Sequence, residues 1–147
     1  NPPLRTQRDV EALREGLADG TIDVVATDHA PHPAESKECE WQAASFGMIG
    51  LETALPILWQ TMIDSKLMSQ TELMVRMSTK PAEIGRYHDQ GKAIAIGQSA
   101  NLTLFNPSKG WKVDRDLVRS KSRNTPFHGM EFSGSISATF FNGKRTF

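Results

Sequence analysis

Three side chains that could bind a metal or move protons lie within one short stretch of the chain. The stretch reads Thr27-Asp28-His29-Ala30-Pro31-His32 and holds one carboxylate and two imidazoles. Such groups suit a zinc site or proton transfer near neutral pH. In a second interpretation, Asp28 caps a turn while His29 and His32 are ordinary surface histidines. The stretch by itself leaves both interpretations open.

The residues before this stretch predict the elements that position it. A capping box, Thr6-x-x-Asp9, predicts a helix over about 7–18, which an Asp-Gly pair ends. The β-branched run 22–26 then predicts a short buried strand. Because ligands of parallel α/β folds bind beyond the carboxyl ends of the strands, Asp28 would emerge where barrel enzymes carry out their chemistry.

The rest of the chain divides into a helical part and a β-rich part. Apolar spacing predicts a helix from Leu51 to Met62, a capping box predicts another after Ser69, and a proline in a first turn predicts a short one that ends near Gly85. Methionines in this part are expected in the core, namely Met68, Met74 and Met77. Short β-branched runs after Gly91 predict strands at 93–96, 102–105 and 134–140, with a hairpin turn at Asn142-Gly143.

Composition excludes several classes of function. Lys plus Arg and Asp plus Glu both number 17, so the net charge is zero, and no charge block predicts binding to nucleic acid or an acidic membrane. No apolar stretch is long enough for a membrane span. The single cysteine, Cys39, can form neither an internal disulfide nor a thiolate metal site, which favours a reducing cytoplasm.

Several motifs together resemble the class I dihydroorotases. They are Asn1-Pro2-Pro3-Leu4-Arg5, the stretch 27–32, Phe46-Gly47-Met48-Ile49-Gly50-Leu51-Glu52-Thr53-Ala54-Leu55-Pro56, the region from Gly91-Lys92 to Leu104, and Ser122-Arg123-Asn124-Thr125-Pro126-Phe127-x-Gly129. The resemblance covers essentially the whole chain. It implies an α/β fold, the C-terminal part of an amidohydrolase-type (β/α)₈ TIM barrel over 1–90, with 22–26 as its last strand, followed by strands of a small β-sandwich over 91–147.

The same resemblance implies an active site and a reaction. Asp28 would be a zinc ligand and the catalytic base, and substrate contacts would come from Asn1, His32 and the backbone of Phe46 and Gly47. The reaction would be the reversible hydrolysis of dihydroorotate to N-carbamoyl-aspartate, a zinc-dependent step of pyrimidine (UMP) biosynthesis in the cytoplasm. The intact enzyme would hold one or two zinc ions.

The other metal ligands of that family have no counterpart in this chain. One aspartate cannot hold a catalytic zinc ion, which takes about three protein ligands. The start at Asn1, without an initiator Met or a leader pattern, likewise predicts a cut inside a longer chain. We therefore expect an N-terminal part of the same enzyme to complete the site, and the isolated chain to be inactive. A homodimer or an association with aspartate transcarbamoylase would be compatible with the resemblance.

Two other functions remain open at this stage. Another cyclic amidohydrolase, such as a dihydropyrimidinase, hydantoinase or allantoinase, would share the barrel and an aspartate at this position. The N-terminal motif and His32 favour a carboxylated ring, and so dihydroorotate. A non-catalytic dihydroorotase-like subunit that scaffolds aspartate transcarbamoylase is the third candidate.

Overall fold

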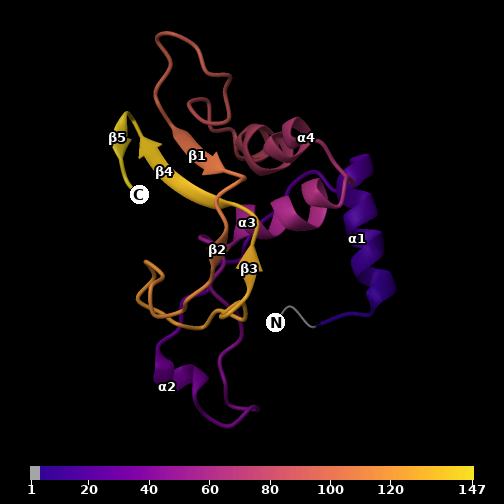
Figure 1. The fold of residues 1–147 in the computed structure, drawn as a ribbon, viewed down its shortest axis with the longest axis vertical. Coiled ribbons are helices and arrows are strands. Elements are labelled where there is room, and N and C mark those ends of the chain that lie inside the picture. Colours follow the sequence, from indigo (N-terminus) through magenta and orange to yellow (C-terminus); the bar gives the residue numbers. More distant parts are fainter. Residues whose placement is uncertain (1–3) are drawn as a thin grey trace.

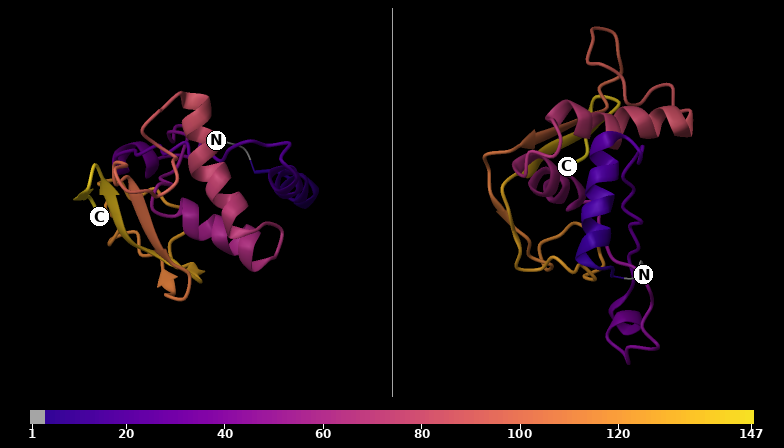
Figure 2. Two further views of the ribbon diagram at one scale, coloured as in Figure 1. Left: turned by 90° about the horizontal axis from the view of Figure 1, so that it is seen from above. Right: turned by 90° about the vertical axis from the view of Figure 1, so that its right-hand side faces the viewer.

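The computed structural model describes residues 4–147, with helices on one side and an antiparallel sheet on the other (Figures 1 and 2). Two of the helices change from α to π geometry without a break, so that α3 continues into η1, and α4 continues through η2 into α5. The helices are α1 (Gln7–Asp19), α2 (Ala34–Lys37), α3 (Ala54–Leu58), η1 (Trp59–Asp64), α4 (Gln70–Met74), η2 (Val75–Thr79) and α5 (Lys80–Gly85). The strands are β1 (Leu102–Asn106), β2 (Trp111–Lys112), β3 (Glu131–Phe132), β4 (Ser135–Phe141) and β5 (Lys144–Arg145).

Both predicted capping boxes are present. The Thr6 backbone N–H donates to the Asp9 carboxylate at 3.0 Å, and α1 ends at Gly20 in the left-handed region, with φ of 92°. At the start of α4, the Ser69 backbone N–H donates to Glu72 Oε2 at 2.8 Å and the Glu72 N–H donates to Ser69 Oγ at 3.3 Å. These bonds satisfy N–H groups that have no partner inside the helix, so the helix starts follow from local sequence.

The capping box of α4 should make stability depend on pH. Hydrogen bonds from the Ser69 side chain and backbone hold the pKa of Glu72 below its usual value of 4.5. The unfolded state therefore binds the proton more readily, and the contribution of Glu72 to stability is present above pH 4.5 and is lost as pH falls through its lower folded-state pKa. We expect Tm to fall more steeply in acid for the wild type than for Glu72→Gln. Thermal melts followed by circular dichroism between pH 7 and 3 measure this difference.

A matched control for that experiment is Glu15→Gln, which removes an exposed glutamate of α1 that belongs to no capping box. Its acid destabilisation should follow that of the wild type. Parallel curves for the wild type and Glu72→Gln would show that the α4 capping box does not set the acid response.

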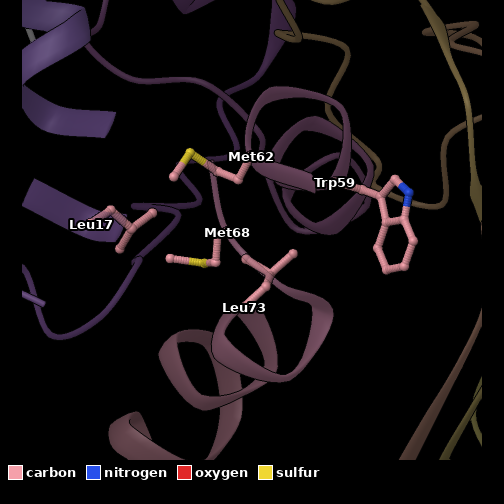
Figure 3. Close-up of a cluster of buried hydrophobic side chains, with 5 residues drawn as sticks. All are labelled: Leu17, Trp59, Met62, Met68 and Leu73. Atoms are coloured by element: carbon pink, nitrogen blue, oxygen red, sulfur yellow. The ribbon is translucent and has the colours of Figure 1, made fainter. Parts of the chain in front are cut away.

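The core lies where three helical segments meet (Figure 3). Leu73 and Met62 are fully buried, and the ring of Trp59 stacks at a tilt against Phe105 of β1 with centroids 4.7 Å apart. This aromatic pair joins the helices to the sheet. The buried cluster consists of Leu17, Trp59, Met62, Met68 and Leu73.

The prediction of core methionines is confirmed for two of the three. Met68 belongs to the buried cluster, and Met77 packs against it. Met74 is 39% exposed, so its assignment to the core is wrong. Its neighbour Leu73 takes the inward position of α4, and a residue one place further along the helix turns toward the surface.

The larger sheet has the order β1-β4-β5 and is antiparallel throughout. It confirms the strands predicted at 102–105 and 134–140. Asn142 and Gly143 both have positive φ, at 49° and 77°, which is the pattern of the type I′ turn that Asn-Gly favours. A separate two-stranded ladder joins β2 to β3, pairing Trp111 with Phe132, and was not predicted.

Two predicted strands are absent from the described residues. The run 93–96 is an exposed loop, with Ile94 at 86% and Ile96 at 107% exposure. Residues 22–26 are not assigned to a strand. Ile22 and Val25 pack against the buried cluster, and the Val25 N–H donates to Arg76 O at 3.4 Å. β-Branched residues favour extended backbone, but a strand also needs a paired neighbour, which neither run has among residues 4–147.

Candidate active site

Two loops that carry the predicted site residues lie side by side. The loop 27–32 and the loop 46–50 are joined by a parallel bridge between His29 and Met48, in which the Ala30 N–H donates to Met48 O at 3.0 Å. The candidate site residues of the two loops are about 20 positions apart in the sequence. The bridge brings them together in one site.

Asp28 lies at the end of the extended segment that follows α1. Its side chain is exposed, and its backbone is in the left-handed region with φ of 44°. Aspartate is one of the few non-glycine residues that visit this region, and such a conformation costs on the order of 1–3 kcal/mol. The backbone therefore turns sharply at the residue for which the resemblance implies the role of catalytic base.

His29 has a structural role between the two loops. Its Nδ1 accepts hydrogen bonds from the backbone N–H groups of Gly50, at 3.0 Å, and Leu51, at 3.4 Å. Through Nδ1 the imidazole thus ties the backbone of the second loop to the residue that follows Asp28. His29 therefore fixes the position of the second loop relative to Asp28.

His32 and Gly47 are brought together by the same arrangement. Gly47 has φ of 102°, and a Cβ placed on it would lie 2.6 Å from the Ala30 Cβ and 3.7 Å from His32 Nε2. The backbone of Gly47 thus lies directly beside the His32 imidazole. The neighbouring Phe46 side chain is 73% exposed and contributes little packing. Asn1, the remaining predicted substrate contact, lies outside the described residues.

Lys37 is a site residue that sequence reasoning missed. Its Nζ donates to Ser45 O at 2.7 Å and to Gly47 O at 3.0 Å, so that α2 holds the loop that leads into Gly47. A lysine in a polar segment has no sequence feature that distinguishes this role from a solvated side chain. Only the fold reveals it.

The described residues do not make a complete metal site. No group of three or more His, Cys, Asp or Glu side chains within residues 4–147 is arranged to hold a metal ion. Asp28 could supply one oxygen ligand, whereas a catalytic zinc ion takes about three protein ligands. The donors among residues 4–147 could therefore supply only part of the ligand set of a catalytic zinc ion.

A cavity lies apart from these loops. It has a volume of about 370 Å³ and is lined mainly by apolar groups, including Trp111, Leu117, Val118, Ile136 and Phe147. None of Asp28, His32 and Gly47 borders it. We assign the candidate site to the two joined loops, where the groups capable of chemistry are. Among residues 4–147, no helix is long and apolar enough to cross a membrane.

Comparison with known proteins identifies the family. The model of the amidohydrolase family matches residues 2–146, and the chain belongs to that family. It is similar to the dihydroorotases of Streptomyces coelicolor, at 53% identity, and of Mycobacterium tuberculosis, at 47%. Each of these alignments covers 99% of this chain and 34% of the relative. The chain therefore spans about a third of the length of the curated relatives it matches.

Solved structures share the same fold. An L-hydantoinase (dihydropyrimidinase) from Arthrobacter aurescens superimposes with a TM-score of 0.87 at 33% identity, covering 98% of this chain and 33% of that one. A D-hydantoinase (dihydropyrimidinase) from Thermus sp. has a TM-score of 0.87 at 28% identity, covering 99% and 32%. The predicted fold class is confirmed, since the chain has the architecture of part of an amidohydrolase.

Proposed function

We propose that this chain supplies part of the active site of a zinc-dependent dihydroorotase. The observation that carries the proposal is the junction of the loops 27–32 and 46–50, which joins the Asp28 loop to the loop that carries Gly47 and sets that glycine beside His32. Identity of 41–53% to curated dihydroorotases, over nearly the whole chain, supports the substrate.

In the proposed mechanism, Asp28 moves one proton. As a water oxygen attacks the ring carbonyl carbon, the Asp28 carboxylate accepts a proton from that water. When the ring carbon–nitrogen bond breaks, Asp28 returns the proton to the departing nitrogen, and N-carbamoyl-aspartate results. One or two zinc ions, with Asp28 among their ligands, would make the water more acidic and polarise the carbonyl.

Substrate recognition is assigned to the neighbouring groups. The His32 imidazole would bind the ring carboxylate, while the backbone at Phe46 and Gly47 would pair with the amide groups of the ring. Fixed backbone donors and acceptors suit a planar ring of amides because they need no rearrangement on binding. Asn1 would add a further polar contact.

The remaining zinc ligands would come from the part of the enzyme that the relatives have and this chain does not cover. That part would also supply the barrel strands that flank 22–26, with 1–90 belonging to the barrel and 91–147 to a small β-sandwich. The isolated chain should therefore be inactive. We place the enzyme in the cytoplasm, as a step of pyrimidine biosynthesis, where a homodimer or an association with aspartate transcarbamoylase would be compatible with this role.

Ring opening tests the proposal directly. The full-length protein that contains this chain, loaded with zinc, is expected to hydrolyse dihydroorotate with a kcat/KM at least tenfold above that for dihydrouracil or hydantoin, since only dihydroorotate offers a carboxylate to His32. Ultraviolet absorbance follows the loss of the ring for each substrate. A preference for dihydrouracil or hydantoin would instead support the hydantoinase-like function of the structural neighbours. No turnover of any ring would favour the non-catalytic scaffold.

A further inference from the structure

A side chain from the far end of the sequence holds the two site loops together. Asn124 Nδ2 donates to Ala30 O at 2.8 Å and to Gly47 O at 3.3 Å. Ala30 is 94 residues away in the chain and Gly47 is 77. One amide group therefore bridges the loop of the proposed base and the loop of the proposed ring contact.

The other polar atoms of Asn124 face the same two loops. Its backbone carbonyl accepts from the Ile49 N–H at 3.2 Å, and its Oδ1 lies 3.5 Å from the His32 N–H, at the limit of a hydrogen bond. Asn124 is half-buried, so these bonds are shielded in part from competing water. Asn124 therefore contacts backbone atoms of both loops, at Ala30 and His32 in the first and at Gly47 and Ile49 in the second.

The segment that carries Asn124 is itself anchored to the residues that directly follow the second loop. Glu52 Oε1 accepts from the backbone N–H of Arg119 at 2.8 Å and of Ser120 at 3.4 Å. The Gly47 carbonyl also accepts a hydrogen bond from Lys37 Nζ at 3.0 Å. The Gly47 carbonyl is thus held by two donors from different segments, which fixes the peptide that follows Gly47.

We propose that Asn124 is a positioning residue that sets the separation between His32 and the Gly47 backbone and thereby the affinity for the ring. This inference rests on the proposed function for the assignment of those two groups to the substrate. Only a carboxamide fits the role, because an NH₂ group must face two carbonyl oxygens. An isosteric carboxylate would replace these donors with negative charge.

The decisive variant is Asn124→Asp in the full-length, zinc-loaded protein. We expect KM to rise about tenfold or more, because two donor bonds are replaced by repulsion, while kcat changes much less. A residue that only supported overall folding would not give this split between KM and kcat.

The matched control is Asn101→Asp. Asn101 also bridges two backbone segments through its amide, donating to Asp89 O at 3.1 Å and accepting from the Asn142 N–H at 2.7 Å, but neither segment contains a site residue. Its KM should remain that of the wild type. Equal KM values for the two variants, or a loss in Asn124→Asp confined to kcat or Tm, would overturn the proposal.

An activity-independent measurement separates this inference from the proposed function. In Asn124→Asp, amide hydrogen exchange should accelerate at Ala30 and Ile49, whose N–H groups lie at the junction that Asn124 holds. Kinetics are followed on whichever cyclic amide the wild type opens fastest. Preference for dihydrouracil would refute the substrate assignment but leave the Asn124 test intact, whereas unchanged exchange at both amides would refute the positioning role.

Discussion

Replacement of Asp28 by asparagine is expected to lower kcat by about 10²–10⁴-fold, the usual contribution of a general acid–base group. Asparagine has nearly the same shape but cannot accept the proton. Because asparagine also tolerates the left-handed backbone seen here, at φ of 44°, the fold should be unaffected. Steady-state hydrolysis of dihydroorotate by the full-length protein, together with Tm, measures both expectations.

Asp23→Asn is the matched control for this variant. Asp23 is exposed and precedes Asp28 in the same extended segment, so the substitution makes the same change of charge five residues away. Its kcat should stay within about twofold of the wild type, as expected for a surface change remote from the chemistry. An Asp28→Asn enzyme that kept the wild-type kcat would exclude Asp28 as the base.

Gly47→Ala is expected to have the second largest effect. The added methyl group would meet the Ala30 Cβ at 2.6 Å, in a backbone conformation with φ of 102° that side chains rarely adopt. One of the two joined loops must therefore move. We expect stability to fall by about 1–3 kcal/mol and KM to rise at least about tenfold, since the Gly47 backbone would shift away from the ring.

Gly97→Ala separates the effect of backbone strain from the effect of contact with the loop 27–32. Gly97 has a similar φ of 89°, but a methyl group there would meet nothing within 4 Å, in a loop far from the site in sequence. The Gly97→Ala variant should lose stability through backbone strain, but its KM should equal that of the wild type. If Gly47→Ala and Gly97→Ala had equal KM values, contact between Gly47 and the loop 27–32 would have no part in substrate binding.

Local sequence determined the helix starts and the hairpin turn, which depend on residues close together in the chain. The capping boxes at Thr6 and Ser69 and the Asn142-Gly143 turn involve residues no more than three positions apart, so their residue types are sufficient to predict them. The stretch around Asp28 likewise offered a candidate base, and together with the other motifs along the chain it indicated the family. None of these predictions required knowledge of what lies across the fold.

Tertiary structure decided which segments pair and which residues hold the site. The run 22–26 has the composition of a strand yet is unpaired among the described residues, because pairing depends on a neighbour that local sequence does not specify. The roles of Lys37 and Asn124 were equally invisible, since each arises from side-chain bonds to backbone carbonyls of other loops. The sequence by itself determined the chemical groups of this protein, and folding decided their mutual distances, because those distances depend on contacts up to 94 residues apart.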